Sequence, residues 1–119
     1  MASLNKVFFF ANLTDHPVLS KTSTGEAVVN FRVAINEAGK VKDVGGKKVT
    51  EEATSTFLDI EAFGRLAEKC SEKLKKGSFV FVDGKLKSID WGEVAKSKIY
   101  VRASGVQFLD FCKIDRWSN

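Results

Sequence analysis

The chain has 119 residues, a length that fits one domain with one hydrophobic core. Hydrophobic residues make up 44% of it, which is typical of a globular protein and excludes a disordered chain. The formal net charge of +4 permits a polyanionic partner without requiring one. No stretch approaches the roughly 20 apolar residues that span a bilayer, and the N-terminus lacks the apolar run of a signal peptide. We therefore expect a soluble, cytoplasmic protein.

Residues that could support catalysis or metal binding are sparse. Cys70 and Cys112 lie far apart and form no CxxC pair, and His16 is the only histidine. Asp59 and Glu61 would share a strand face, but any solvated strand produces such a pair by alternation. No Walker loop, GxGxxG or GxSxG motif occurs. We expect no enzyme, no metal site and no cofactor.

The first predicted strand covers residues 5–13. Val7 and Phe9 begin one apolar face, while Phe8 and Phe10 make the opposite face apolar as well. A strand that is apolar on both sides is buried on both sides, by its own barrel and by something else. Another subunit is the natural candidate.

A turn-rich segment, 12–25, leads to a second strand over 27–37. That strand alternates cleanly, with these residues pointing inward: Val29, Phe31, Val33 and Ile35. Residues 38–53 are polar around Gly45-Gly46, which predicts a long, mobile hairpin. Its tip is cationic through Lys40, Lys42, Lys47 and Lys48.

The third strand, around residues 56–63, carries the most informative pattern. One face is apolar through Leu58, Ile60 and Ala62. The other face carries acidic residues and should be solvated, yet Phe57 and Phe63 lie there too. Two explanations compete: the rings stack on something flat such as nucleic-acid bases, or another subunit covers them.

A helix is predicted over 65–76, because Leu66, Cys70 and Leu74 recur every four residues and give one narrow apolar stripe. Cys70 on this stripe should be an inert core thiol. Gly77 is the expected C-cap.

The fourth strand, 78–88, should place Val80, Val82 and Leu86 inside and Phe79 and Phe81 outside. A turn around Trp91 leads to a last strand over 96–103, extending to Phe108 at most. Five antiparallel strands with one helix between the third and fourth indicate an all-β, five-stranded OB-fold Greek-key barrel. We expect this domain over residues 1–109, followed by a short extension over 110–119.

A single nucleic-acid strand can be held by outer aromatic rings that stack on bases while cations follow the phosphates. The candidate rings are Phe57, Phe63 and Trp91, and the candidate cations are Lys6, Arg32, Lys85 and Lys87, with Lys96 and Lys98 nearby. Each stacked base contributes on the order of 1–3 kcal/mol. The alternatives are burial of Phe57 and Phe63 at a subunit contact, and packing of Trp91 on its own barrel.

Short segments in a fixed order also resemble a known family. They are Asn5-Lys6-Val7, Asn12-Leu13-Thr14, Phe63-Gly64-Arg65-Leu66-Ala67-Glu68, Leu74-Lys75-Lys76-Gly77-Ser78, Val82-Asp83-Gly84-Lys85-Leu86 and Val106-Gln107-Phe108-Leu109. With this set the chain resembles the bacterial single-stranded DNA-binding proteins over almost its whole length.

The resemblance implies a homotetramer of OB folds that binds single-stranded DNA regardless of sequence, in replication, recombination and repair. It matches Phe57, Phe63 and Trp91 to base-stacking positions. It places the first strand, with Val7 and Phe9, at the dimer contact. Phe79 and Phe81 fall where one dimer packs on another.

Two departures from the family stand out. Gly39 occupies a position where many members have a stacking Trp, and the chain ends without the family's long tail and acidic tip that recruits replication and repair proteins. Either the tail has been trimmed or the protein works without it. The alternatives are a primosome-type accessory dimer, a structural subunit that binds only protein, and a nuclease.

Overall fold

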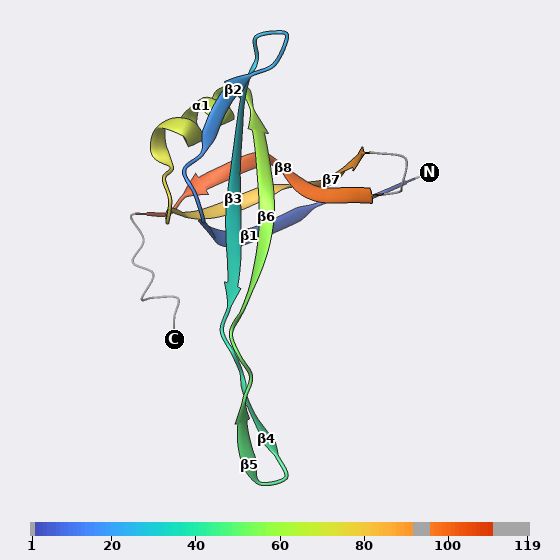
Figure 1. Ribbon diagram of the computed structural model, residues 1–119, viewed down its shortest axis with the longest axis vertical. Coiled ribbons are helices and arrows are strands. Elements are labelled where there is room, and N and C mark those ends of the chain that lie inside the picture. The colour runs from blue at the N-terminus through green and yellow to red at the C-terminus, as the bar shows by residue number, and fades with distance from the viewer. Residues whose placement is uncertain (1, 92–95, 111–119) are drawn as a thin grey trace.

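Five strands form the barrel in a computed structural model that describes residues 2–91 and 96–110, with backbone alone at 91, 96 and 97. Going along the chain, they are β1 (Val7–Leu13), β3 (Ala27–Glu37), β6 (Thr54–Phe63), β7 (Phe79–Trp91) and β8 (Lys96–Phe108). Figure 1 shows them wrapped into one closed unit, with the helix α1 (Gly64–Lys73) at one end.

The barrel closes because β1 pairs with two strands. The sheet order is β1-β7-β8-β6-β3, and β1 returns to β3 through the pairs Asn12 with Ala34 and Leu13 with Val33. Among the described pairings, only β6 with β8 is parallel, so the prediction that all five strands are antiparallel is wrong for this pair. This order, with one helix between the third and fourth barrel strands, confirms the predicted OB fold.

The core is built by strand alternation. The inward residues of the second predicted strand are nearly all sealed, with Val29 and Val33 fully buried, and its bounds agree with the prediction. The other strands add the following buried residues: Ala11, Leu13, Ile60, Ala62, Val80, Val82, Val101 and Ala103. Burying this apolar surface is the main stabilising term of a small barrel.

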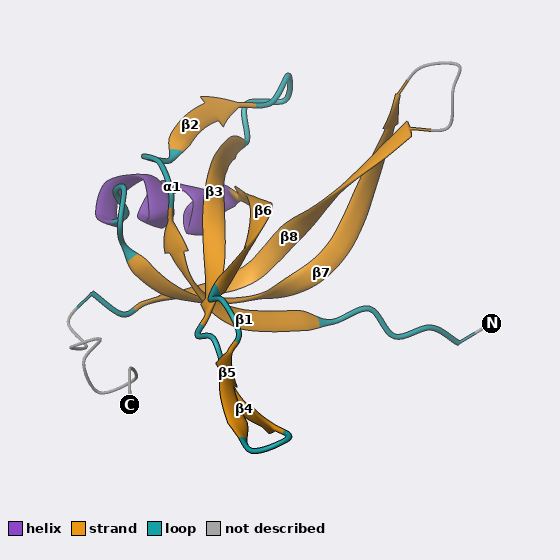
Figure 2. Cartoon of the chain, turned by 60° about the horizontal axis from the view of Figure 1, so that its bottom comes forward, coloured by secondary structure: helices purple, strands orange, loops and turns teal. Residues whose placement is uncertain are grey.

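Helix α1 lies at one end of the barrel (Figure 2) and packs against it with a narrow apolar stripe. Ala67 and Cys70 are buried there, and burial raises the pKa of the Cys70 thiol to about 11. The thiol therefore stays protonated, which confirms the expectation of an inert core residue. Within the described part of the chain, no helix has the length and apolar character needed to span a bilayer.

The helix ends earlier than predicted. It stops at Lys73, and Leu74 is its C-cap in an extended conformation, so the prediction of Gly77 as C-cap is wrong. The cause is a local turn: the Lys75 amide donates to Ser78 Oγ at 3.0 Å, and the Ser78 amide donates to the Lys75 carbonyl at 3.0 Å. Leu74 remains buried, but beyond the helix.

A short strand was missed in the turn-rich segment. The strand β2 (Val18–Lys21) pairs with β3 along the edge of the sheet. All four of its residues are exposed, so no buried alternation marks it in the sequence.

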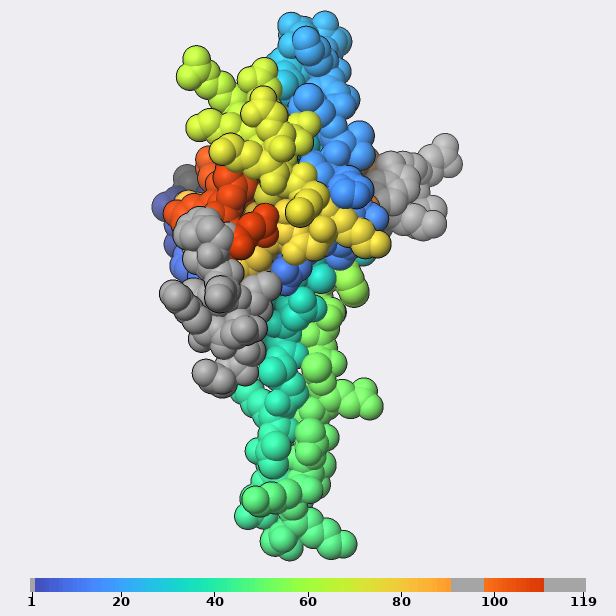
Figure 3. Space-filling view, turned by 90° about the vertical axis from the view of Figure 1, so that its left-hand side faces the viewer, coloured from blue at the N-terminus to red at the C-terminus, as the bar shows by residue number. Residues whose placement is uncertain are grey.

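The polar segment after β3 forms a hairpin, as predicted. Its strands are β4 (Val41–Val44) and β5 (Lys47–Thr50), and all their side chains are exposed. Figure 3 shows this hairpin standing clear of the barrel, which gives the molecule its longest dimension of 62 Å. The Lys42 ammonium lies 2.5 Å from the Glu51 carboxylate, so part of the cationic charge is balanced within the hairpin.

Strands β7 and β8 continue past the barrel as a two-stranded arm (Figure 2). Here the prediction of an inward Leu86 is wrong, because this side chain is 44% exposed. The reason is that β1 pairs with β7 only as far as Gly84. Leu86 lies on the same face of β7 as the core residues of this strand, but it lies beyond the closed part of the barrel.

Alternation separates the two faces of β1, as the sequence predicts. Val7 and Phe9 pack against the core, whereas Phe8 and Phe10 are 64% and 44% exposed. The outward aromatic face of β1 is therefore made by Phe8 and Phe10, because alternate residues of a strand point to opposite sides.

A close backbone approach at Gly84 predicts a strong effect of substitution. A Cβ there would lie 2.3 Å from the Arg102 carbonyl oxygen and 3.0 Å from Ala103 Cα, at the irregularity between Asp83 and Gly84. We expect Gly84→Ala to lower the free energy of unfolding by about 1–3 kcal/mol, because backbone cannot yield as a side chain can. Urea unfolding followed by circular dichroism measures it.

Gly105→Ala is the matched control, since the nearest atom to a Cβ at Gly105 is Asp83 Cβ at 4.0 Å. Its unfolding free energy should change by less than about 1 kcal/mol. Equal unfolding midpoints for the two variants would contradict the role assigned to the close approach.

Candidate nucleic-acid interface

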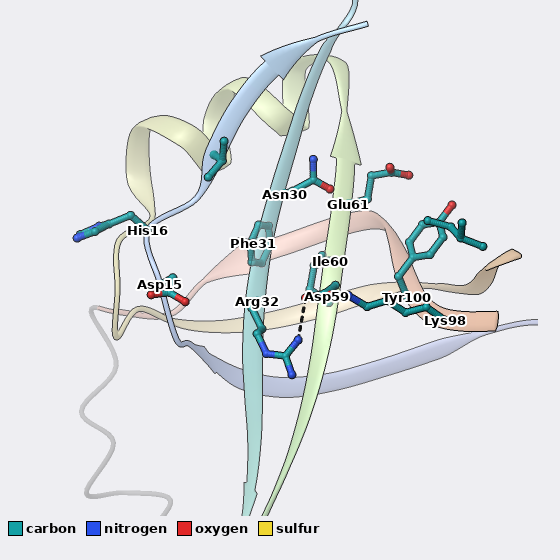
Figure 4. A pocket seen from close by; sticks show the side chains of 12 residues that line it. Asp15, His16, Asn30, Phe31, Arg32, Asp59, Ile60, Glu61, Lys98 and Tyr100 are labelled. Atoms are coloured by element: carbon teal, nitrogen blue, oxygen red, sulfur yellow. Dashed lines mark hydrogen bonds and ion pairs between the residues drawn. The ribbon is translucent and has the colours of Figure 1, made fainter. Parts of the chain in front are cut away.

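The outer faces of β3, β6 and β8 form a groove of about 410 Å³. Figure 4 shows its walls: Asp15 and His16 on one side, Arg32 and Asp59 in the middle, and Lys98 and Tyr100 arriving from β8, with these other lining residues: Val18, Asn30, Phe31, Ile60, Glu61 and Ile89. The surface is open to solvent and contains both charges and rings.

Alternation along β6 places the two predicted rings on the outer face of this strand, beside the groove and outside its lining. Ile60 and Ala62 are sealed in the core, so Phe57, Asp59, Glu61 and Phe63 must face outward. Phe57 is 52% exposed, and the Phe63 ring is half-buried. Both rings are therefore accessible in the single protomer.

The first cluster on this face is built around Phe57. The Arg32 guanidinium lies over the Phe57 ring, 5.5 Å from its centroid. Its Nη1 lies 3.1 Å from Asp59 Oδ1, a contact drawn in Figure 4. The Lys98 ammonium pairs with the other Asp59 oxygen. Register explains the meeting, since Arg32 lies directly opposite Asp59 on the neighbouring strand.

The second cluster repeats this arrangement around Phe63. The Arg102 guanidinium lies 4.7 Å from the Phe63 centroid. Its Nε and Nη2 donate to Glu61 Oε1 at 3.2 and 2.9 Å. A cation over an aromatic face is attracted by the ring quadrupole, so the ring and the carboxylate together hold the guanidinium.

Sequence reasoning missed Arg102 and Tyr100 as residues of this face. A signal was present in the alternation of β8. Val101 and Ala103 are buried, so Tyr100, which precedes Val101, and Arg102, which lies between the two, point outward. The prediction concentrated on lysines, and nothing in the sequence pairs β8 with β6. That parallel pairing brings Arg102 opposite Glu61.

The charges on this face shift each other's titration. The pKa of Asp59 is lowered below its ordinary value of 3.8, chiefly by the hydrogen bond from Lys98, against partial burial. The pKa of Arg102 is raised, chiefly by its hydrogen bonds to Glu61. Both shifts favour the charged forms, so these ion pairs persist at neutral pH.

The predicted lysines lie at the edge of the same surface. Lys85 pairs with Arg102 and Lys87 with Tyr100 across β7 and β8, and directly opposite residues share a face. Lys6 lies beside Lys85 in a neighbouring hollow, with its ammonium 2.5 Å from the Asp83 carboxylate.

Two predicted features fall elsewhere. The backbone of Trp91 ends β7, but its side chain lies outside the described residues, as do Cys112 and the extension beyond Asp110. At Gly39 a Cβ would lie 1.8 Å from the Glu51 carbonyl oxygen, because the two backbone segments that lead into the hairpin approach closely there. This backbone conformation leaves no space for a stacking side chain at position 39.

A second aromatic group lies on the outer faces of β1 and β7. Phe10 stacks on Phe79 with centroids 5.8 Å apart and tilts against Phe81 at 5.2 Å, and Phe8 lies 6.2 Å from Phe81. We call these four residues the outer phenylalanine cluster. It combines the predicted Phe79 and Phe81 with the outward residues of β1.

Within residues 2–91 and 96–110, no group of three His, Cys, Asp or Glu side chains is placed to hold a metal ion. His16 Nδ1 accepts a hydrogen bond from the Lys76 amide at 3.3 Å. Asp59 and Glu61 are both engaged by cations. The acidic pair of the third predicted strand thus organises positive charge.

The lowered pKa of Asp59 predicts a pH effect on stability. A carboxylate with a lowered folded-state pKa contributes stability above its ordinary value of 3.8, and the contribution is lost as the pH falls through and below that value. Asp59→Asn lacks it, so the variant should lose less stability than the wild type between about pH 6 and about pH 3. The difference should stay below about 1 kcal/mol, because the pair is partly solvated.

Urea midpoints of both proteins at the two pH values provide the measurement. Glu72→Asn is a control for removing an exposed carboxylate on α1. A larger acid-induced loss in Asp59→Asn than in the wild type would contradict the assigned ion pairs.

Comparisons with known proteins agree with this architecture. Residues 4–109 match the profile of the Single-strand binding protein family. The chain is 34% identical over 109 residues to the single-stranded DNA-binding protein of Aquifex aeolicus, covering 90% of this chain and 71% of that protein. It is 39% identical over 100 residues to single-stranded DNA-binding protein 1 of Xylella fastidiosa, covering 84% and 71%.

Solved structures give the same result. The crystal structure of the wild-type single-stranded DNA binding protein from Thermus aquaticus superposes with a TM-score of 0.71 at 30% identity over 89% of this chain, which spans half of that chain. The Plasmodium falciparum SSB complex with ssDNA superposes with a TM-score of 0.78 at 22% identity, covering 92% of this chain and 98% of that one, and supports the fold. The chain belongs to the Single-strand binding protein family.

Proposed function

We propose that this protein binds single-stranded DNA across the outer face of β3, β6 and β8, regardless of base sequence. The observation that carries the proposal is the pair of accessible rings, Phe57 and Phe63, on one strand face, each with a guanidinium beside it. The names of the relatives, all single-stranded DNA-binding proteins, support the same ligand. The family is one of DNA-binding proteins and not of enzymes.

The chemistry of the face explains why binding should not depend on sequence. Rings stack on the flat surface that every base has, and cations attract the phosphates that every nucleotide has. Neither contact reads the hydrogen-bonding edge of a base. Such a protein coats and protects single strands, which is the role needed in DNA replication, recombination and repair, and it would work in the cytoplasm with the chromosomal DNA.

The cations define a path for the strand. Lys85 and Lys87 on the arm lead to Arg102 and Lys98, and these lead to Arg32 on β3. We assign Phe63 and Phe57 to two separate bases along this path and Trp91 to a base on the arm. Lys6 lies at the edge of the path, beside Lys85.

Replacing a stacking ring tests the proposal. Phe63→Ala should weaken binding of a fluorescein-labelled oligo(dT) by about 1–3 kcal/mol, because one base loses its platform. Fluorescence anisotropy titration at fixed salt measures this. Phe63→Trp is the matched control: it keeps a flat ring and should bind about as well as the wild type.

The same experiment distinguishes the main alternative. If Phe63→Ala binds oligo(dT) like the wild type but forms a smaller assembly in solution, the ring belongs to a subunit interface. The structural-subunit function is then favoured. Loss of intact oligonucleotide in the presence of magnesium would instead indicate a nuclease.

The outer phenylalanine cluster supports a homo-oligomer, and we assign the protein a tetramer. Phe8 and Phe10 are 64% and 44% exposed, and their rings join those of Phe79 and Phe81 into one continuous apolar surface. Contiguous exposed apolar surface of this kind usually meets protein. It lies on β1 and β7, away from the rings of β6, so both surfaces can be used at once.

A charge placed in the cluster should separate the subunits. Phe8→Arg should lower the solution mass measured by sedimentation equilibrium, because an unpaired charge cannot be buried cheaply. Val41→Arg, on the β4 strand with a similar exposure of 63%, should keep the wild-type mass. A wild-type dimer favours the primosome-type accessory protein, and a wild-type monomer contradicts the assignment of the cluster.

A further inference from the structure

We infer that Glu61 and Asp59 are selectivity residues. Their carboxylates form ion pairs with the cations of the proposed binding face and compete with phosphates, so that single strands are preferred over other polyanions. The inference rests on the proposed function and extends it. It concerns what the face rejects, whereas the proposed function concerns what the face binds.

The geometry around Phe63 shows what a ligand must displace. Glu61 accepts two hydrogen bonds from Arg102, at 2.9 and 3.2 Å, and the guanidinium covers the ring at 4.7 Å. The side chains of Arg102 and Glu61 are only 37% and 22% exposed. A phosphate can engage Arg102 fully only when the carboxylate gives it up.

The Phe57 cluster repeats this construction, which argues against chance placement of an acid. Asp59 holds both Arg32 and Lys98, and Arg32 lies over the Phe57 ring. In both clusters a carboxylate on β6, two residues from the ring, restrains a guanidinium from a neighbouring strand.

The charge balance of the two clusters is nearly even. Three cations, Arg32, Lys98 and Arg102, face two carboxylates, Asp59 and Glu61, which leaves one net positive charge on the centre of the face. The lowered pKa of Asp59 and the raised pKa of Arg102 keep both ion pairs charged. A ligand that brings only phosphates exchanges one ion pair for another and gains little.

A single strand gains more from the same exchange. When a phosphate draws Arg102 away from Phe63, the exposed ring can receive a base, so the cost of opening the ion pair is offset by stacking. Duplex DNA has the same phosphates but its bases are already stacked and paired. The carboxylates therefore disfavour ligands that offer phosphates alone, because only unpaired bases supply the stacking that offsets the loss of the ion pair.

Neutralising Glu61 tests the inference. Wild type and Glu61→Gln are titrated at low salt with oligo(dT) and with a hairpin duplex that has the same number of phosphates. We expect Glu61→Gln to bind the duplex about three- to tenfold more tightly, because a partly exposed ion pair no longer competes, while affinity for oligo(dT) rises by less. The logarithm of the duplex affinity should also fall more steeply with the logarithm of the salt concentration in Glu61→Gln than in the wild type. The slope should steepen by about 0.9 for each additional cation released from the DNA.

Glu72→Gln on α1 is the matched control, because it adds the same charge at an exposed site away from the groove. It should leave the ratio of single-strand to duplex affinity at the wild-type value. A ratio in Glu61→Gln equal to that of Glu72→Gln overturns the inference, and so does a loss of oligo(dT) binding in Glu61→Gln.

The two proposals fail in different ways. If the wild type binds neither probe, the proposed function is wrong and the inference falls with it. If the wild type binds oligo(dT), Phe63→Ala weakens that binding and Glu61→Gln keeps the wild-type ratio, only the inference is wrong. Thermal unfolding checks that each variant folds, and Asp59→Asn carries the same test should Glu61→Gln be unfolded.

Discussion

The two-residue period of β6 is the constraint on which the rest of the binding face depends. Ile60 and Ala62 are sealed in the barrel, and a shift of one residue would expose both and bury two carboxylates. The inner face therefore holds the register, and the outer face receives Phe57, Asp59, Glu61 and Phe63 as a consequence. The packing of the core thus decides on which side of the strand the two rings lie.

The outward side chains of β6 contact cations that the neighbouring strands on either side supply. β3 supplies Arg32 opposite Asp59, and β8 supplies Arg102 opposite Glu61. Each acid restrains a cation, and each cation covers a ring. A face that looked from the sequence like a mixture of acids and aromatics is an ordered set of ring, cation and carboxylate. Its charges are close to balanced, with three cations facing two carboxylates, so in the proposed function stacking is the decisive contribution to binding.

The barrel also separates two kinds of aromatic surface. The rings of β6 lie among charges, while the outer phenylalanine cluster on β1 and β7 is apolar throughout. Phe57 and Phe63 lie beside cations, which suits a charged, flat ligand, whereas exposed phenylalanines whose rings pack on one another suit a protein surface. In the proposed function the same residue type therefore serves two purposes, which depend on its neighbours.

The sequence by itself determined the order of the five barrel strands and the helix along the chain and the outward position of Phe57 and Phe63, because hydrophobic periodicity is a local property of the chain. It also indicated the cationic hairpin and the buried, inert Cys70. It failed where burial depends on distant strands. Leu86 has the alternation of a core residue but lies past the last pairing of β1 with β7.

Only the tertiary structure brought Arg102 to Glu61 and Phe63. These residues are 41 and 39 positions apart, and the parallel pairing of β6 with β8 that joins them leaves no trace in local periodicity. The end of the helix at Lys73 likewise followed from a turn closed by the buried Ser78. Local patterns specify which way a side chain points, whereas the closure of the barrel decides which side chains it meets.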